Sequence, residues 1–293
     1  MTTTVPIVDA NVHFWDQGAN PVFWLTDRTM LRDMLGDYDS LPATYTLDDY
    51  RREVGSYDVR GVVWSDPGAA DPVAAAASVQ RQNDSRGMVL GLVALADPTA
   101  PQFAELVEHF VQIPLVTSVR VRLAAGLAAP AAATFDTSVL DNLRLLADHR
   151  LVATIEANGD QLDSVAALVG QLRELRIVID HFGWPMEVTE SALPEHFERL
   201  APFTAAPNVA TRIDAIGTIF GDWTVDRIRP WLLRVVEAFG PGRCMLGSDL
   251  PIERLRSGFG RLYDAYDEIF AGYSQDERAA LFGRTAQSWY GRT

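Results

Sequence analysis

The stretch IVDANVHFWD, residues 7–16, decides how the fold of this chain is interpreted. It starts as an apolar, β-branched run with the length of a buried strand and then presents Asn11 and His13. The same arrangement recurs at His181 in IVIDHFGWP and at Asp249 in CMLGSDLPI. Such runs are typical of buried parallel strands, and α/β enzymes place their chemistry at or just beyond the C-terminal ends of these strands. The spacing therefore predicts an enzyme.

Short apolar runs alternate with helical patterns along the chain, which is the signature of repeated βα units and a parallel sheet. The predicted strands cover residues 7–14, 60–64, 89–95, 118–123, 151–156, 177–180, 209–213 and 244–247. Helical patterns lie at 47–55, 72–85, 101–112, 137–149, 161–174, 193–201, 224–239 and 255–271, and a last one covers 275–289. These units predict one domain over residues 1–293, a (β/α)8 TIM barrel with an extra C-terminal helix.

A long segment follows the first strand. Residues 15–47 show no convincing helical pattern, although they contain several large apolar side chains. A loop of that length inside a compact domain is normally functional or packed. Two interpretations stay open: the segment covers the mouth of the barrel, or it runs over the outer helices as a surface excursion.

The charge and hydropathy of the chain exclude some classes of partner. The chain has 293 residues, 48% of them hydrophobic, and a formal net charge of -14. Nucleic acids and anionic membranes need a basic footprint, so neither is an expected partner. No run approaches the roughly 18 apolar residues of a membrane span, and the N-terminus carries no secretory pattern. We therefore expect a cytoplasmic protein.

Two residue counts limit the chemistry. The single cysteine, Cys244, lies in an apolar run and has no partner for an internal disulfide, which predicts a packing role in a reducing compartment. All 25 basic side chains are arginines, so Schiff-base and carbamylated-lysine chemistry are excluded.

The polar residues of the first run are spaced by two. In a strand, positions two apart share one face, so we expect Asp9, Asn11 and His13 to project together. Polar side chains that point into a barrel are costly unless they are hydrogen-bonded or functional. A lone histidine is more often a satisfied core residue, but here other strand ends present ionisable groups as well. The pattern favours a site built from several strands.

Three motifs resemble a known family. IVDANVHFWD is similar to the opening strand of the amidohydrolase superfamily, IVIDHFGWP to its sixth-strand histidine, and GPGRCMLGSDLPI to its eighth-strand aspartate. More narrowly, VTSVRVRL and NGDQLDSVAALVGQLRELRIVIDHFGWP resemble the lactonase-type branch, which includes sugar lactonases and 2-pyrone-4,6-dicarboxylate hydrolase. The resemblance spans nearly the whole chain. It implies a TIM barrel that hydrolyses a small cyclic molecule.

The chain departs from the superfamily pattern at position 11, where Asn11 replaces the first metal-ligating histidine. An amide is a poor ligand for Zn²⁺, which favours imidazole, thiolate and carboxylate. If one divalent metal such as zinc or manganese is held, His13, His181 and Asp249 would be its ligands. The resembling branch includes members that work without metal, and we expect no cofactor here.

Hydrolysis of an ester needs a deprotonated water and donors for the tetrahedral oxyanion. Asp249 is the best candidate for the base. His181 and His13 can polarise the carbonyl or donate to the oxyanion, and Asn11 can add an amide donor. The resemblance implies the same roles for Asp249, His181 and His13.

Further strand-end residues are candidates for binding the substrate. Arg120 and Arg122 lie two apart and, on an interior face, would anchor an anionic group; the alternative is an ion-pair network. Glu156 is either an added ligand or base, or a solvated or paired carboxylate. Arg212 and Asp214 have the parity of an internal ion pair.

Aromatic residues also follow three strand ends. Trp15, Trp64 and Trp184 would wall a ring-shaped substrate, or else serve in ordinary packing.

The sequence thus predicts a hydrolase that opens a lactone of a carboxylated small molecule through water activated by Asp249. One alternative is a metal-dependent decarboxylase or cyclic amide hydrolase on the same barrel. Another is an altered barrel that acts as a biosynthetic isomerase or dehydratase, or that only binds a ligand. The expected partner is an anionic small molecule, and a homodimer through the outer helices is an open option.

Overall fold

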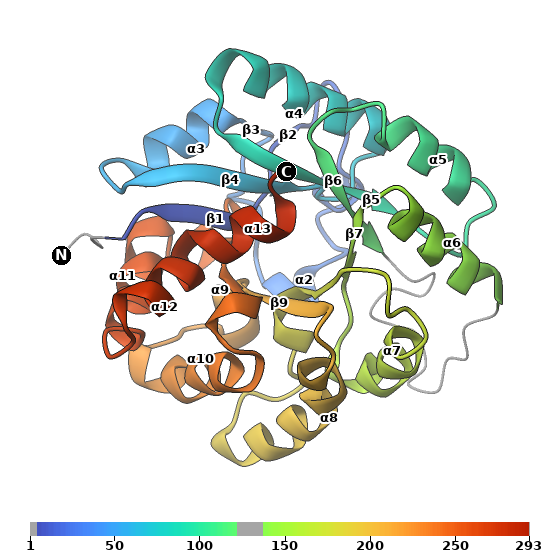
Figure 1. Cartoon of the computed structure of the whole chain (residues 1–293). Helices are drawn as coiled ribbons and strands as arrows, with labels where there is room; N and C mark the ends of the chain where they lie inside the picture. The colour runs from blue at the N-terminus through green and yellow to red at the C-terminus, as the bar shows by residue number, and fades with distance from the viewer. Residues whose placement is uncertain (1–4, 122–136, 293) are drawn as a thin grey trace.

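Parallel strands surround the centre of the computed structural model, which describes residues 5–121 and 137–292 (Figure 1). The sheet has eight strands in the order β1-β4-β5-β6-β7-β8-β9-β10. A parallel bridge between Val12 and Leu250 joins the chain beyond β10 to β1. The strands are β1 Ile7–Val12, β4 Val59–Ser65, β5 Val89–Ala96, β6 Val116–Val121, β7 Val152–Ile155, β8 Ile177–Ile179, β9 Val209–Ile213 and β10 Cys244–Leu246. All the predicted strands are present, and the predicted (β/α)8 barrel is confirmed.

Helices follow the strands and form the outer ring (Figure 1). They are α3 Leu47–Val54, α4 Pro72–Arg86, α5 Phe103–Phe110, α6 Thr137–Asp148, α7 Leu162–Val169, α8 Leu193–Ala205, α9 Ile216–Phe220, α10 Val225–Phe239 and α11 Phe259–Ile269. The side chains of Thr46, Asp71 and Thr224 cap the first turns of α3, α4 and α10. These caps satisfy N–H groups that a helix start leaves unpaired, which explains why the predicted starts were close.

The helix predicted at 275–289 is divided. It consists of α12 Gln275–Ala279, a π-helical turn Ala280–Arg284, and α13 Thr285–Tyr290. Trp289 and Tyr290 pack into the inner cluster of the barrel. Thr117, next to the start of β6, donates to the Tyr290 carbonyl oxygen at 2.7 Å. The extra C-terminal helix therefore closes the end of the barrel where the strands begin.

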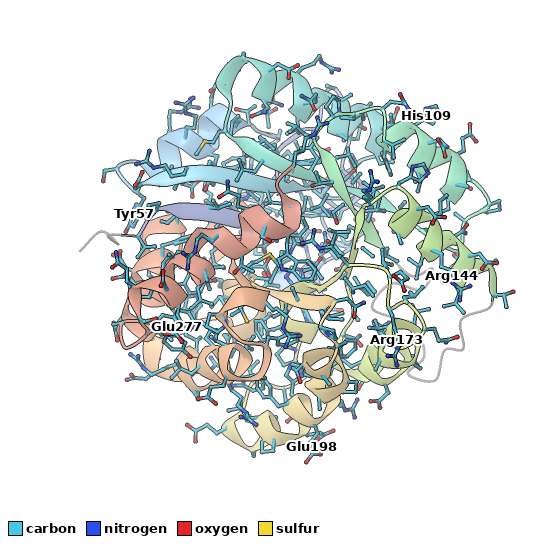
Figure 2. The ribbon with its side chains drawn as sticks, in the orientation of Figure 1. Tyr57, His109, Arg144, Arg173, Glu198 and Glu277 are labelled. Atoms are coloured by element: carbon cyan, nitrogen blue, oxygen red, sulfur yellow. The ribbon has the colours of Figure 1, made fainter. Side chains whose placement is uncertain are left out.

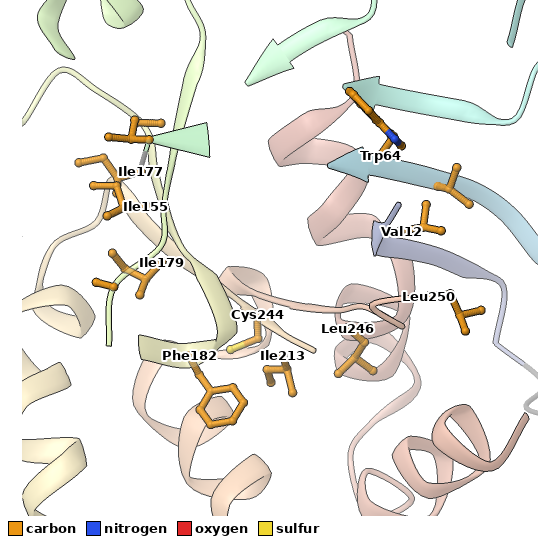
Figure 3. Close-up of a cluster of buried hydrophobic side chains, with 14 of the residues drawn as sticks. Val12, Trp64, Ile155, Ile177, Ile179, Phe182, Ile213, Cys244, Leu246 and Leu250 are labelled. Carbon is orange, nitrogen blue, oxygen red and sulfur yellow. The ribbon is translucent and has the colours of Figure 1, made fainter. Parts of the chain in front are cut away.

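The hydrophobic core has two parts, because alternate strand residues face opposite sides. The outer part lies between strands and helices and includes Trp64, Ile177, Phe182 and Cys244 (Figure 3). The predicted packing role of Cys244 is confirmed, since its thiol is buried and free. The inner part fills the barrel with Val8, Ala10, Val63, Val93, Val152, Val178, Ala210 and Met245.

The long segment after β1 packs at the opposite end from α13. It contains the paired strands β2 Trp15–Asp16 and β3 Thr44–Tyr45, and the one-turn helices α1 Phe23–Thr26 and α2 Arg32–Leu35. The Trp24 indole N–H donates to the Pro67 carbonyl oxygen at 2.7 Å, just after β4. Arg256, after β10, donates to the Leu35 carbonyl oxygen at 3.1 Å. The segment thus contacts loops that follow two strand ends, the position expected of a cover.

Charged and polar side chains lie on the outer helices, among them His109, Arg144 and Glu198 (Figure 2). Across the described ranges, we find no helix that combines the length and the apolar character needed to cross a bilayer.

Candidate active site

The first strand changes register between Asp9 and Val12. Asp9 accepts a hydrogen bond from the Tyr50 hydroxyl of α3 at 2.9 Å and from the Ser248 backbone N–H at 2.7 Å. Its carboxylate is therefore turned toward the helix layer, while Asn11 and His13 reach the end of β4, Arg212 in β9 and Asp249 after β10. The expectation that all three polar residues share one face was wrong for Asp9, because a register shift breaks the two-residue period.

Asp249 receives two hydrogen bonds on one carboxylate oxygen. His13 Nε2 lies 3.0 Å from Asp249 Oδ1, and the Asn11 amide nitrogen donates to the same oxygen at 3.2 Å. The hydrogen bonds that the structure describes at this carboxylate all end on Oδ1. The other oxygen, Oδ2, is thus left to accept a proton.

The His13 ring carries a proton on the side away from Asp249. Its Nδ1 lies 2.7 Å from the Ser65 carbonyl oxygen, which can only accept, so Nδ1–H must donate. A neutral ring would then present a bare Nε2 to a carboxylate oxygen, and two acceptors do not hydrogen-bond. The contact between His13 and Asp249 therefore holds a second proton, on either the imidazole or the carboxyl.

His181 forms the second half of the site. Its Nδ1 lies 2.7 Å from Asp214 Oδ1, and Arg120 Nη2 donates to its Nε2 at 3.3 Å. Burial alone would lower the pKa of His181, but the carboxylates of Asp214 and Asp180 outweigh it and raise the pKa above its ordinary value. The Trp184 ring lies 5.0 Å away, edge-on to the imidazole. His181 is thus held by carboxylate, guanidinium and aromatic neighbours.

Buried charges of alternating sign connect the two halves. Arg120 lies 3.2 Å from Glu156 and 3.2 Å from Asp180, and Arg212 lies 2.6 Å from Asp180. Arg212 also lies 3.8 Å from Asp214 and donates to the Asn11 amide oxygen at 3.3 Å. These contacts join Asn11, His13, His181 and Asp249, which are far apart in sequence, into one network.

The contacts of this network decide between the alternatives that the sequence left open for Arg120 and Glu156. Arg120 is in an ion-pair network, and its guanidinium already faces two carboxylates and His181. Glu156 is paired rather than merely solvated. The predicted pairing of Arg212 with Asp214 is present, although Asp180 is the closer partner of Arg212. Arg122 lies outside the described residues.

The backbone is strained where these side chains are aimed. His181 and Asp249 have φ values of 52° and 59°, in the left-handed region that non-glycine residues rarely adopt. Such conformations cost about 1–3 kcal/mol each and persist where the surrounding structure imposes them, often at functional sites. The strain lies at the ends of β8 and β10, where the predicted catalytic residues are.

Only one of the three candidate tryptophans contacts the site histidines. Trp15 packs edge-on against Trp24 and donates to the Pro42 carbonyl oxygen, within the segment after β1. Trp64 is fully buried in the outer core and donates to the Phe14 carbonyl oxygen. This burial leaves Trp64 no surface to offer a substrate, because its strand parity turns it toward the helices. Trp184 remains the candidate for lining the substrate-binding site.

The arrangement of donors bears on the metal alternative. Among the described residues, no three His, Cys, Asp or Glu side chains are grouped so that they could hold a metal ion. His13 Nε2 faces Asp249, a guanidinium N–H takes the Nε2 lone pair of His181, and position 11 supplies an amide. Arranged in this way, these residues do not fit a divalent ion, and we derive no step through one.

Sequence reasoning missed Asp66 and Asp180. Asp66 follows β4 and is fully buried; burial raises its pKa to about 6, although backbone hydrogen bonds and the charges of Arg120 and His13 oppose the rise. Asp180 was treated only as a strand residue. Both are strand-end carboxylates next to apolar runs, the same signal that singled out Asp249, and Asp180 directly precedes His181 within the IVIDHFGWP motif.

A barrel whose strand ends gather histidines and carboxylates is the architecture of a TIM-barrel enzyme. The chain belongs to the amidohydrolase family, because the model of that family matches residues 8–292. Hydrolase is thus the class of enzyme that its family indicates.

Two curated relatives cover nearly the whole chain. An uncharacterized protein of Sinorhizobium fredii is 25% identical over 300 residues, covering 98% of both chains. The L-fucono-1,5-lactonase of Burkholderia ambifaria is 26% identical over 315 residues, covering 97% of this chain and 94% of the lactonase.

Solved structures share the fold. An amidohydrolase from Burkholderia multivorans with bound zinc has a TM-score of 0.82 at 21% identity, covering 97% of this chain and 99% of that one. A probable 2-pyrone-4,6-dicarboxylic acid hydrolase from Acinetobacter baumannii has a TM-score of 0.69 at 15% identity, with 97% and 98% covered. A manganese-bound 5-carboxyvanillate decarboxylase from Novosphingobium aromaticivorans has a TM-score of 0.63 at 13% identity, with 98% and 97% covered.

Proposed function

We propose that this protein opens a lactone by hydrolysis, with Asp249 as the general base. The observation that carries the proposal is the asymmetry of the Asp249 carboxylate. His13 and Asn11 fix its Oδ1, which leaves Oδ2 to take a proton from water. Membership of the amidohydrolase family supports a hydrolase, and the likeness to a sugar-acid lactonase supports a cyclic ester.

The reaction has two steps. In the first, Asp249 removes a proton from water while the water oxygen bonds to the lactone carbonyl carbon, and the carbonyl oxygen becomes an oxyanion. The guanidinium N–H of Arg120 that faces the Nε2 lone pair of His181 is the donor for this charge. In the second step, the ring C–O bond breaks, and the leaving oxygen takes the proton from Asp249. The product is the open hydroxy acid.

His13 is the first positioning residue of the base. Its contact with Asp249 holds a proton, and Ser65 fixes the ring from the other side. Because the ring cannot rotate without losing both contacts, Oδ2 keeps its direction through the cycle. Asn11 acts as a second positioning residue rather than as an oxyanion donor, since its amide contacts Asp249 and Arg212.

Metal-dependent decarboxylation is the alternative reaction on the same fold. The structural likeness to the manganese-bound decarboxylase is the observation that favours it. It needs a divalent ion at the strand ends. The hydrogen bonds among His13, Asp249 and Asn11 favour the metal-free hydrolysis instead.

The test is a panel of lactones assayed by the acid released, with mass spectrometry to detect the addition of one water. We expect turnover by the wild type, and a loss of about 100-fold or more for His13→Gln, within the range for acid–base groups. The matched control is His109→Gln, an exposed histidine on α5, which should keep full activity. Release of carbon dioxide in place of a hydroxy acid would overturn the proposal.

A further inference from the structure

We propose that the lactone is a neutral, hydroxylated one and that Asp66 binds one of its hydroxyl groups. This inference rests on the proposed lactone hydrolysis and names its substrate class. It departs from the expectation of a carboxylated substrate, which depended on Arg120 and Arg122 being free to anchor an anion.

Asp66 is held in one orientation beside the site. It directly follows Ser65, whose carbonyl oxygen fixes the His13 ring. Its Oδ1 accepts hydrogen bonds from the backbone N–H groups of Gly68 at 2.8 Å and Ala69 at 2.9 Å. These two bonds fix the carboxylate, so the direction of Oδ2 is set before any ligand binds.

The Oδ2 atom of Asp66 has no partner among the described residues. Other buried side-chain atoms at the site also lack a well-aligned hydrogen bond, but those of Arg120, Asp180, Arg212 and Asp214 are in ion pairs. For Asp66 Oδ2 the structure describes neither a hydrogen bond nor an ion pair. A buried acceptor without a donor is costly, and a ligand hydroxyl that donates to it removes the cost.

The charges around the site argue against an anionic substrate. Five carboxylates, those of Asp66, Glu156, Asp180, Asp214 and Asp249, surround the guanidiniums of Arg120 and Arg212 and two imidazoles. With all five ionised, these described residues together stay negative even when both imidazoles are protonated. A substrate carboxylate would add like charge in a buried site, whereas hydroxyl groups can donate to oxygens already present.

The ionisation of Asp66 is compatible with this role. Burial raises the pKa of Asp66 to about 6, so the carboxylate is largely ionised at neutral pH and accepts from a hydroxyl. In the protonated state it would become a donor.

Asp66→Asn is the variant that tests the proposal. The two backbone N–H groups keep the amide oxygen at the Oδ1 position, so the amide nitrogen replaces Oδ2 and an acceptor becomes a donor. Asp16→Asn is the matched control. Asp16 has the same turn, with its Oδ1 accepting from Gly18 at 2.9 Å and Ala19 at 3.3 Å, but it is exposed.

The assay compares kcat/KM on D-glucono-1,5-lactone and L-fucono-1,5-lactone, on unsubstituted δ-valerolactone, and on 2-pyrone-4,6-dicarboxylate. We expect the wild type to prefer a hydroxylated lactone over the dicarboxylate by about 100-fold or more. Asp66→Asn should lower kcat/KM on that lactone about 10-fold, which is the size of one hydrogen bond to a charged group. The same variant should keep kcat/KM on δ-valerolactone within about two-fold of the wild type and should raise kcat/KM on the dicarboxylate. Asp16→Asn should leave kcat/KM on all four substrates unchanged.

Two results would overturn the inference and leave lactone hydrolysis standing: a wild type that prefers the dicarboxylate, or an equal loss on every lactone in Asp66→Asn with an unchanged far-UV circular dichroism spectrum. If the wild type opens no lactone at all, the proposed function fails and this inference fails with it.

Discussion

The interior of the barrel has an apolar lower part and an ionic upper part, separated by two residues along the same strands. On β8 the lower residue is Val178, and the next interior residue is Asp180, directly after the strand. On β9 the pair is Ala210 and Arg212. All four are fully buried. Burial alone thus does not decide which residue type a position holds. The lower part is stabilised by packing, and the upper part is tolerated because the guanidiniums of Arg120 and Arg212 meet carboxylates of opposite charge.

The largest effect should come from Asp249→Asn in the upper part. Removing the proton acceptor should lower kcat/KM by about 1,000-fold, within the range for a general base, while the fold stays intact. Steady-state kinetics on the best lactone of the panel measures the loss, with exposed Asp222→Asn as the control. If Asp249→Asn kept more than a tenth of the wild-type kcat/KM, another residue would have to be the base.

A pair of substitutions, one in β8 and one directly after it, compares the two parts directly. Asp180→Asn removes the carboxylate between Arg120 and Arg212 and should lower the free energy of unfolding by about 3–5 kcal/mol, because it leaves buried guanidiniums short of a partner. Val178→Ala creates a cavity one layer below and should cost about 2 kcal/mol. Urea unfolding of both variants measures the difference.

The same pair separates stability from function. Asp180→Asn should also lower activity by at least about 10-fold, since Arg120 and His181 depend on its charge. Val178→Ala should keep kcat within about two-fold. Equal losses of activity in the two variants would show that the ionic part acts only as packing.

The dependence of stability on pH should arise from buried carboxylates of the upper part and of the adjoining layer. Burial raises the pKa of Asp9 and Asp66 from 3.8 to about 6. It also raises the pKa of Glu253, which lies after β10 and accepts from the Gly217 N–H, from 4.5 to about 7. Between about pH 4 and pH 7 the folded chain therefore holds protons that the unfolded chain has released, and stability falls as pH rises through this window. His181, with a raised pKa, acts in the same direction.

Urea midpoints at pH 5.5 and pH 7.5 test this expectation. The midpoint should be higher at pH 5.5, and Asp66→Asn should reduce the difference, whereas Val178→Ala should leave the difference unchanged. Asp214 has the opposite effect on stability. Burial would raise its pKa, but His181 and Arg212 lower it, so the stability that Asp214 contributes is lost only when the pH falls into strong acid. A urea midpoint that rises with pH would contradict the raised pKa values of these carboxylates.

The smallest effect should follow removal of metal. Dialysis against a chelator should change kcat/KM by less than about two-fold, because His13 and His181 direct their nitrogens to Asp249 and Arg120. Asn11→His should raise the zinc content of the purified protein, since it returns a third imidazole to the strand ends. Loss of activity on chelation, restored by zinc or manganese, would favour the metal-dependent alternative.

The sequence predicted the fold closely and the site in part. Each strand is visible in a local apolar run, and Asn11, His13, His181 and Asp249 stand at strand ends that a closed barrel must bring together. Asp9 was misplaced because the register shift in β1 leaves no mark in the residue pattern. The partners of Arg120 could not be predicted, because parity places a side chain on a face without saying which neighbour it meets.

The sequence by itself determined the barrel, because hydrophobic periodicity depends on neighbours along the chain. It also determined that chemistry lies at the strand ends. Only the tertiary structure decided that Arg120 is already paired, that Asp249 is fixed on one oxygen, and that Asp66 keeps an oxygen free of partners among the described residues. These properties are electrostatic and depend on distances and burial between residues far apart in sequence, which a one-dimensional pattern does not contain.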